Sequence, residues 1–140
     1  IDSVLNEVAS ILSLAIESAT KDKAAAPDQL VEMVWHCATL VHTRPSVMRV
    51  WLDWTTAISS PIWPKYLNFQ NDTLALFTRI IRKGKQQGLI DERVRAGEAA
   101  RVIVGESHML AMLLFEGADD EQTRKFIRHY VLMACHYVEH

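Results

Sequence analysis

Glycine and proline are scarce in this sequence, and so are signs of β-structure. The 140 residues contain five glycines and four prolines, which lie mainly between periodic segments. No run alternates apolar and polar side chains for long, whereas apolar residues recur at helical spacing almost everywhere. Few helix breakers and a persistent helical period predict an all-α fold.

Long apolar runs and cysteine are also lacking. A membrane-spanning helix needs roughly 18 apolar residues, and the nearest candidate, Val102–Phe115, is interrupted by Glu106 and His108. No basic segment leads into an apolar one, as a signal peptide would require. The two cysteines, Cys37 and Cys135, are too few for a disulfide framework. We therefore expect reduced core thiols in a cytoplasmic protein that does not contact membranes.

Positive charge shows no excess. The formal net charge is -2, and charged residues make up 23% of the chain. A domain that binds nucleic acid usually carries a basic face, so this chain alone is a poor candidate for DNA binding. The hydrophobic fraction of 49% suits one compact domain with a substantial core. The chain begins at Ile1 rather than at a methionine, from which we expect a fragment of a longer protein.

Motifs for metal binding and catalysis are missing too. Neither Glu-x-x-His nor His-Glu-x-x-His occurs, and the pair His129 and His136 lacks a third ligand at a suitable spacing. Asp53, Glu106 and Glu116 lie in apolar neighbourhoods, but nothing pairs them as general acid and base. No phosphate-binding glycine loop or nucleophile elbow is present. We therefore expect no catalytic residue, no metal and no cofactor, and a protein that is not an enzyme.

The apolar spacing predicts one domain of six helices. We expect Gly88 to end the longest helix as its C′ residue, and Asp119 or Asp120 to cap the last one. The residue before Pro45 resists helix, which separates the second helix from the third. The predicted helices cover approximately residues 4–16, 27–43, 46–58, 64–87, 97–116 and 121–138.

The last two predicted helices are too apolar for a helix that buries one face. The fifth is apolar on all sides and the sixth carries two apolar stripes, so the second face of each favours a partner. A two-fold axis pairing both helices with their copies would form a four-helix interface in a homodimer. The alternative is that one of these helices is simply central. The predicted interface residues are Val102, Leu110, Leu113, Leu114, Phe126, Tyr130, Ala134 and Tyr137.

Aromatic and sulfur-containing residues are concentrated between positions 33 and 77. Ordinary core packing explains most of them, but large rings leave irregular gaps and methionine adapts to varied guests. An apolar cavity with a few polar groups is typical of a small-molecule site, and the polar residues that recur in this stretch are Thr55, Asn68, Gln70, Asn71 and Thr73. The aromatic and methionine residues are Met33, Trp35, Met48, Trp51, Trp54, Trp63, Tyr66, Phe69 and Phe77.

Two short motifs resemble the TetR family of transcriptional regulators. They are Val-Trp-Leu-Asp-Trp at 50–54 and Ile-Trp-Pro-Lys-Tyr at 62–66. They are most similar to the HapR/SmcR group of vibrio quorum-sensing master regulators (LuxR-type), which carry Val-Trp-Phe-Glu-Trp-Ser and Val-Trp-Pro-Leu-Phe. The spacing from Pro64 to Gly88 and the ending Cys135-His136-Tyr137 also resemble that group. The resemblance spans about positions 25–140.

The resemblance implies a ligand-binding and dimerisation domain over residues 1–140, with a helix-turn-helix DNA-binding domain before Ile1. The first helix would connect the two domains, and a small apolar or amphipathic effector would shift DNA affinity. Leu74, Ser107 and Gln70 depart from the group, where an amide, a thiol and an asparagine stand, so the same ligand is not implied. The residues expected to bind ligand are Trp51, Tyr66, Gln70, Leu74 and Ser107, together with Trp54, Trp35 and Phe77 from the aromatic cluster.

Two other functions are compatible with this pattern. One is a helical protein-interaction or dimerisation module whose core is filled and which binds no ligand. The other is a small helical enzyme, for which the sequence supplies no convergent ligands or acid–base pair. The sequence names neither the ligand, nor the operator, nor the sign of regulation.

Overall fold

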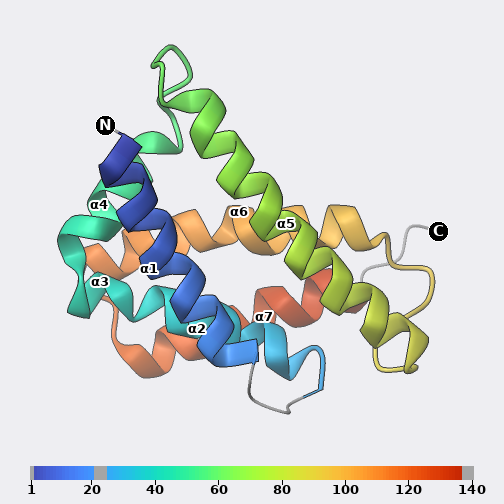
Figure 1. The fold of residues 1–140 in the computed structure, drawn as a ribbon. Coiled ribbons are helices and arrows are strands. Elements are labelled where there is room, and N and C mark those ends of the chain that lie inside the picture. The colour runs from blue at the N-terminus through green and yellow to red at the C-terminus, as the bar shows by residue number, and fades with distance from the viewer. Residues whose placement is uncertain (1, 21–24, 137–140) are drawn as a thin grey trace.

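The computed structural model describes residues 2–20 and 25–136, which fold into helices and contain no strand. The all-α prediction is therefore confirmed. Figure 1 shows the arrangement, with α1 and α5 lying in front of α6. The helices are α1 (Asp2–Thr20), α2 (Asp28–Ala38), α3 (Leu40–Thr43), α4 (Pro45–Trp54), α5 (Trp63–Gln86), α6 (Ala96–Phe115) and α7 (Asp120–His136).

The helix predicted over 27–43 is divided at Thr39 into α2 and the single turn α3. The Thr39 hydroxyl donates to the carbonyl of His36 at 2.7 Å. A threonine side chain that bonds the preceding turn competes with the regular helical pattern and bends the chain. The six longer helices thus correspond to the six predicted ones, with α3 as a short addition.

The helix predicted over 46–58 ends earlier than expected. In the structure α4 stops at Trp54, and Thr55 caps it with a hydroxyl that donates to the carbonyl of Leu52 at 2.6 Å. Ile58, the last residue of the predicted helix, is 69% exposed in the following loop. Two adjacent threonines at 55 and 56 favour a turn over helix continuation because they are β-branched and bond locally.

The predicted helix ends at Gly88 and Asp119 are confirmed. Gly88 has a positive φ of 76°, and the Leu89 N–H donates to the carbonyl of Gly84 at 2.9 Å, which is a Schellman ending. The Asp119 carboxylate accepts from the Gln122 N–H at 2.8 Å and so caps α7. These two local devices fix where α5 stops and where α7 begins.

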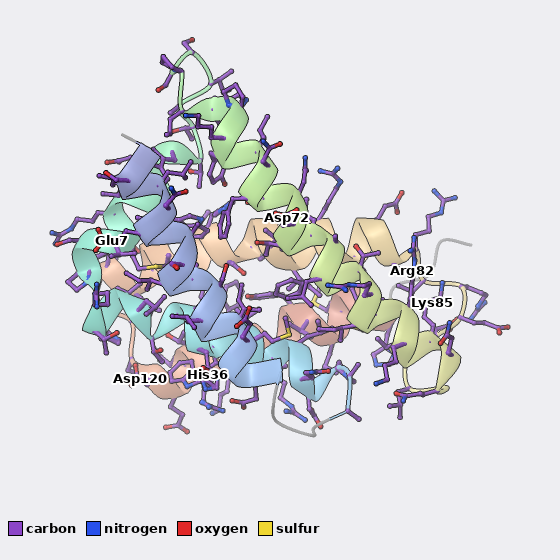
Figure 2. The ribbon with its side chains drawn as sticks, in the orientation of Figure 1. Glu7, His36, Asp72, Arg82, Lys85 and Asp120 are labelled. Carbon is purple, nitrogen blue, oxygen red and sulfur yellow. The ribbon has the colours of Figure 1, made fainter. Side chains whose placement is uncertain are left out.

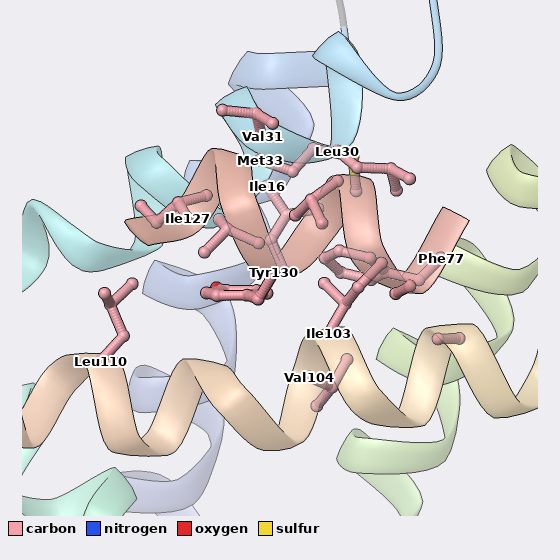
Figure 3. Packing of buried hydrophobic residues seen from close by; sticks show 14 of the residues in the cluster. Ile16, Leu30, Val31, Met33, Phe77, Ile103, Val104, Leu110, Ile127 and Tyr130 are labelled. Atoms are coloured by element: carbon pink, nitrogen blue, oxygen red, sulfur yellow. The ribbon is translucent and has the colours of Figure 1, made fainter. Parts of the chain in front are cut away.

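A single apolar core joins the helices. α1 packs on α2, α6 packs on α5 and α7, and α2 also contacts α7. Figure 3 shows part of the layer between α6 and α7, where Ile103, Leu110, Ile127 and Tyr130 meet. Charged side chains lie at the periphery, among them Asp72 on α5 (Figure 2).

Within the described residues, no helix is both long enough and apolar enough to span a bilayer. The two cysteines do not form a disulfide, since Cys37 and Cys135 are both free thiols. Cys135 is fully buried and Cys37 is half-buried, as the sequence led us to expect for core thiols.

Candidate ligand-binding site

A cavity of about 50 Å³ lies between α1, α2, α4, α5 and α6. It is bounded by side chains that project from all five helices into one space. Its walls are mostly apolar, and polar atoms come from a few side chains of α2, α5 and α6. The lining residues are Leu12, Ile16, Val34, Cys37, Ala38, Met48, Trp51, Phe69, Gln70, Thr73, Phe77, Val104, Ser107, Leu110 and Ala111.

Four of the predicted ligand-binding residues line this cavity. Trp51 comes from α4, Gln70 and Phe77 from α5, and Ser107 from α6. They are separated by up to 56 positions in the chain, yet the fold brings them to one space because α4, α5 and α6 converge there. Trp51 and Phe77 are buried, whereas Gln70 and Ser107 are half-buried.

The other four predicted residues do not line the cavity. Tyr66 is 2% exposed, and its hydroxyl donates a hydrogen bond to Oε1 of the lining residue Gln70 at 3.0 Å. Leu74 and Trp54 pack against the core from partly buried positions. Trp35 lies beside α7, where the Arg124 guanidinium sits 4.6 Å from its ring centroid. The spacing of apolar residues predicts which face of a helix a residue lies on, but it does not predict which other helix packs against that face.

Several lining residues fell outside the predicted site. Leu12 and Ile16 of α1 lie in the first predicted helix, at residues 4–16, but nothing in the sequence linked that helix to the aromatic cluster. Cys37 was interpreted as plain core, and Leu110 was assigned to the dimer interface, yet both line the cavity. For Leu110 no sequence signal was available, because α6 is apolar on all sides.

The polar groups that line the cavity are uncharged, and some of them already donate hydrogen bonds to backbone carbonyls. Ser107 donates its hydroxyl hydrogen to the carbonyl of Ile103 at 2.8 Å, and Thr73 donates to that of Phe69 at 3.1 Å. Both hydroxyl oxygens therefore keep lone pairs that can accept. Burial raises the pKa of the Cys37 thiol to about 12, so this lining group stays protonated.

The charge state of the cavity follows from this composition. Burial also raises the pKa of Tyr66, the partner of Gln70, to about 12. No Asp, Glu, Lys or Arg is among the lining residues. A charged guest would lose its hydration without gaining a counter-ion, which is costly in an apolar site. The cavity therefore suits a neutral, largely apolar molecule.

The predicted interface residues on α6 and α7 differ widely in exposure. Leu110, Leu114, Tyr130 and Ala134 are buried by the chain's own core, with Leu110 1% exposed. Leu113 and Phe126 are half-buried, and Val102 is 49% exposed. Tyr137 lies outside the described residues. The side chains best placed to meet a partner are thus only partly the ones that we predicted.

An exposed apolar face remains on the same two helices. Val102, Met109 and Met112 of α6 are each about half exposed, and Met133 of α7 is 70% exposed. Between the two helices, Val102 and Met133 border a groove of about 360 Å³, which Arg95 and Glu98 flank at one end. Soluble monomers rarely expose a row of large apolar side chains on adjoining helices.

The described residues contain no group of three or more His, Cys, Asp or Glu side chains that could hold a metal ion. No family model, curated protein or solved structure matches this chain. The function is therefore argued from the cavity and from the exposed face of α6 and α7.

Proposed function

We propose that this chain is the effector-binding and dimerisation domain of a TetR-type DNA-binding transcriptional regulator, in line with the motifs at 50–54 and 62–66. The observation that carries the proposal is the cavity between α1, α2, α4, α5 and α6. It gathers Trp51, Gln70 and Ser107, three residues that the resemblance assigns to ligand binding, from three different helices. Apolar walls with a few fixed polar groups are the usual composition of a small-molecule site.

The effector is a neutral apolar or amphipathic molecule that enlarges the cavity on binding. A volume of about 50 Å³ is far below the roughly 300 Å³ of typical ligand pockets. Part of the wall is adaptable, because Met48 is a flexible side chain and Phe69 is only half-buried. Movement of these two side chains would open space next to Gln70 and Thr73.

Regulation would pass through α1. Leu12 and Ile16 of this helix form part of the cavity wall and are buried against it. A ligand that displaces Leu12 and Ile16 would therefore shift α1, the helix that would connect to the DNA-binding domain. A ligand shifts DNA affinity only if it binds one arrangement of the two DNA-binding domains better than the other. Equal operator affinity of the full-length dimer with and without saturating ligand would rule this mechanism out.

The homodimer would form through α6 and α7, whose exposed apolar residues lie on adjoining helices. Gly105 lies on the exposed side of α6, and a Cβ built there meets no atom within 4 Å. A partner helix could therefore approach α6 closely at this point. A stable dimer buries about 800 Å² on each subunit, which two helices of this length can supply.

The small cavity favours one alternative, a helical dimerisation or protein-interaction module with a filled core. Native mass spectrometry of the purified domain, before and after mild denaturation, separates the two. A dimer that carries an additional small apolar molecule, released on unfolding, would support the regulator domain. A dimer that neither retains a guest nor takes one up from a panel of neutral aromatic compounds would favour the filled module. A monomer would contradict the homodimer and leave only a module that binds a different protein.

A further inference from the structure

Gln70 and Thr73 are the two polar side chains that α5 contributes to the cavity wall. They are three positions apart in the helix, so their side chains lie next to each other on one face. Both residues are half-buried, whereas Trp51 and Phe77 of the same wall are buried. The polar pair therefore lies closer to solvent than the aromatic part of the cavity does.

The hydrogen bond from Tyr66 determines which end of the Gln70 amide is left for a ligand. The Tyr66 hydroxyl donates to Oε1 of Gln70 at 3.0 Å, and the phenol ring that carries it is buried. Among the described residues, the amide nitrogen of Gln70 has no hydrogen-bond partner. Tyr66 is not a lining residue, so the carbonyl end of the amide is bonded outside the wall. The NH2 group, which can only donate, is left for a ligand.

Thr73 offers the opposite kind of group. Its hydroxyl hydrogen goes to the carbonyl of Phe69 at 3.1 Å, so its oxygen accepts from a ligand while that bond is kept. α5 thus presents a hydrogen-bond donor and an acceptor next to each other. Because no Asp, Glu, Lys or Arg lines the cavity, the ligand group that matches this pair is neutral.

We propose that Gln70 and Thr73 bind the edge of a primary carboxamide or a lactam, and that Tyr66 is the positioning residue that fixes the polarity of this site. The carbonyl oxygen of such a ligand accepts from the Gln70 NH2 group, and its N–H donates to the Thr73 hydroxyl. Primary carboxamides and lactams carry an acceptor and a donor on the same edge, whereas a trans secondary amide directs them to opposite sides. This inference rests on the proposed function, since it requires that the cavity takes up a ligand.

Tyr66 acts on ligand choice through the orientation of the Gln70 amide. Without the Tyr66 hydroxyl the amide can turn over, because its oxygen and its NH2 group are similar in shape. The site could then offer Gln70 an acceptor role as well as a donor role. In the motif that residues 62–66 resemble, phenylalanine stands at the position of Tyr66, so the motif does not share this feature. We therefore expect Tyr66→Phe to change ligand preference rather than to weaken all binding.

The test uses three neutral compounds that share a phenyl ring: benzamide, acetophenone, which only accepts, and aniline, which mainly donates. Each is titrated against the wild-type chain and Tyr66→Phe, and binding is followed by NMR chemical shifts. Benzamide should shift the side-chain NH2 signal of Gln70, which Gln70→Leu identifies by its absence. In Tyr66→Phe, aniline should bind about fivefold more tightly, because the amide oxygen is free to accept from it, whereas acetophenone should bind no more tightly.

A second variant tests the acceptor. Thr73→Val should weaken benzamide binding about fivefold and leave acetophenone affinity unchanged, because only benzamide donates to this hydroxyl. The matched control is Thr78→Val on the same helix. The Thr78 hydroxyl also bonds the preceding turn, at the Leu74 carbonyl 2.7 Å away, but Thr78 does not line the cavity. This control should leave the affinities for both compounds unchanged.

The outcomes separate this inference from the proposed function. Equal responses of aniline and acetophenone to Tyr66→Phe would show that the Tyr66 hydroxyl has a purely structural role, and would overturn this inference alone. Unchanged benzamide affinity in Thr73→Val would do the same. Failure of all three compounds to bind the wild-type chain would overturn the proposed function together with it.

Discussion

The indole ring of Trp51 packs against the imidazole of His108, with the ring centroids 4.6 Å apart and the planes inclined at 46°. Trp51 lines the cavity from α4, and His108 lies behind it on α6. The Nε2 atom of His108 is buried and has no hydrogen-bond partner among the described residues. A residue that lines the cavity, Trp51, is therefore in direct contact with a side chain that can gain a proton, His108.

The His108 contact predicts that stability falls at acidic pH. Burial lowers the pKa of His108 below its usual value of 6.5, so the folded state resists a proton that the unfolded state accepts. The unfolded state binds more protons below about pH 6.5, and its relative free energy therefore drops as the pH falls. Urea unfolding between pH 5 and 8 should show a steeper acid-side loss for the wild type than for His108→Phe, which keeps the ring contact.

The comparison contains its own control, because both proteins share every other titrating group. Above pH 7.5 their free energies of unfolding should run parallel, since His108 is neutral in both states there. Parallel curves down to pH 5 would mean that protonation of His108 costs the folded state nothing.

The hydrogen bond between Tyr66 and Gln70 predicts strong coupling of these two residues. Gln70→Leu leaves the buried Tyr66 hydroxyl without its acceptor, which should cost about 1–3 kcal/mol of unfolding free energy. Adding Tyr66→Phe should restore at least half of that loss, because both polar partners are then gone. A double-mutant cycle by chemical denaturation measures this coupling, and simple additivity of the two changes would refute it.

The sequence predicted those features of the fold that depend on local chemistry. Gly88 and Asp119 marked helix ends because only certain residues adopt a positive φ or cap an N-terminus, and both were confirmed. The helix predicted over 46–58 is too long because the helical spacing of apolar residues continues past Trp54 to Ile58, while the backbone turns at Thr55. The spacing of apolar residues alone does not predict a helix end that is formed by a side-chain hydroxyl, as at Thr55.

The candidate site was predicted in part, for a related reason. Trp51, Gln70, Phe77 and Ser107 could be proposed because motif and composition pointed to them. Leu110 and Met109 could not be sorted into inner and outer positions from sequence, because α6 has apolar residues on every side. The structure turns Leu110 to the cavity and leaves Met109 51% exposed, a choice made by packing against α5 and α7.

The exposed face of α6 predicts a dimer that one charge can disrupt. Met109→Lys places an ammonium group at the centre of the proposed interface, which should raise the dimer dissociation constant at least about tenfold. Light scattering coupled to size-exclusion chromatography across a dilution series measures the shift. Circular dichroism should stay unchanged, because Met109 is already half exposed.

The control for this variant is Ile58→Lys, which introduces the same charge at another exposed apolar residue, in the loop after α4. It should leave the dimer intact. A wild-type chain that stays monomeric at high concentration, or a Met109→Lys variant that dimerises normally, would exclude this face as the interface.

The close approach at Gly84 predicts an unusual response to alanine. A Cβ built on Gly84 would lie 2.7 Å from Cδ1 of Ile90 and 3.1 Å from Cβ of Ala26. Ile90 is only 2% exposed, so its side chain cannot move out into solvent and would have to repack within the core. Alanine normally stabilises a helix by about 1 kcal/mol relative to glycine, but here overpacking should reverse the sign.

We expect Gly84→Ala to lower the free energy of unfolding by about 1–2 kcal/mol, as measured by urea denaturation. The control is Gly97→Ala in α6, where a Cβ meets nothing within 4 Å, and it should be neutral or stabilising by up to about 1 kcal/mol. The carbonyl of Gly84 also accepts from the N–H groups of Leu89 and Ile90, so a shift of Ile90 would disturb the helix end as well. Equal stabilisation by both substitutions would show that Ile90 can move away and that α5 does not need a glycine at this position.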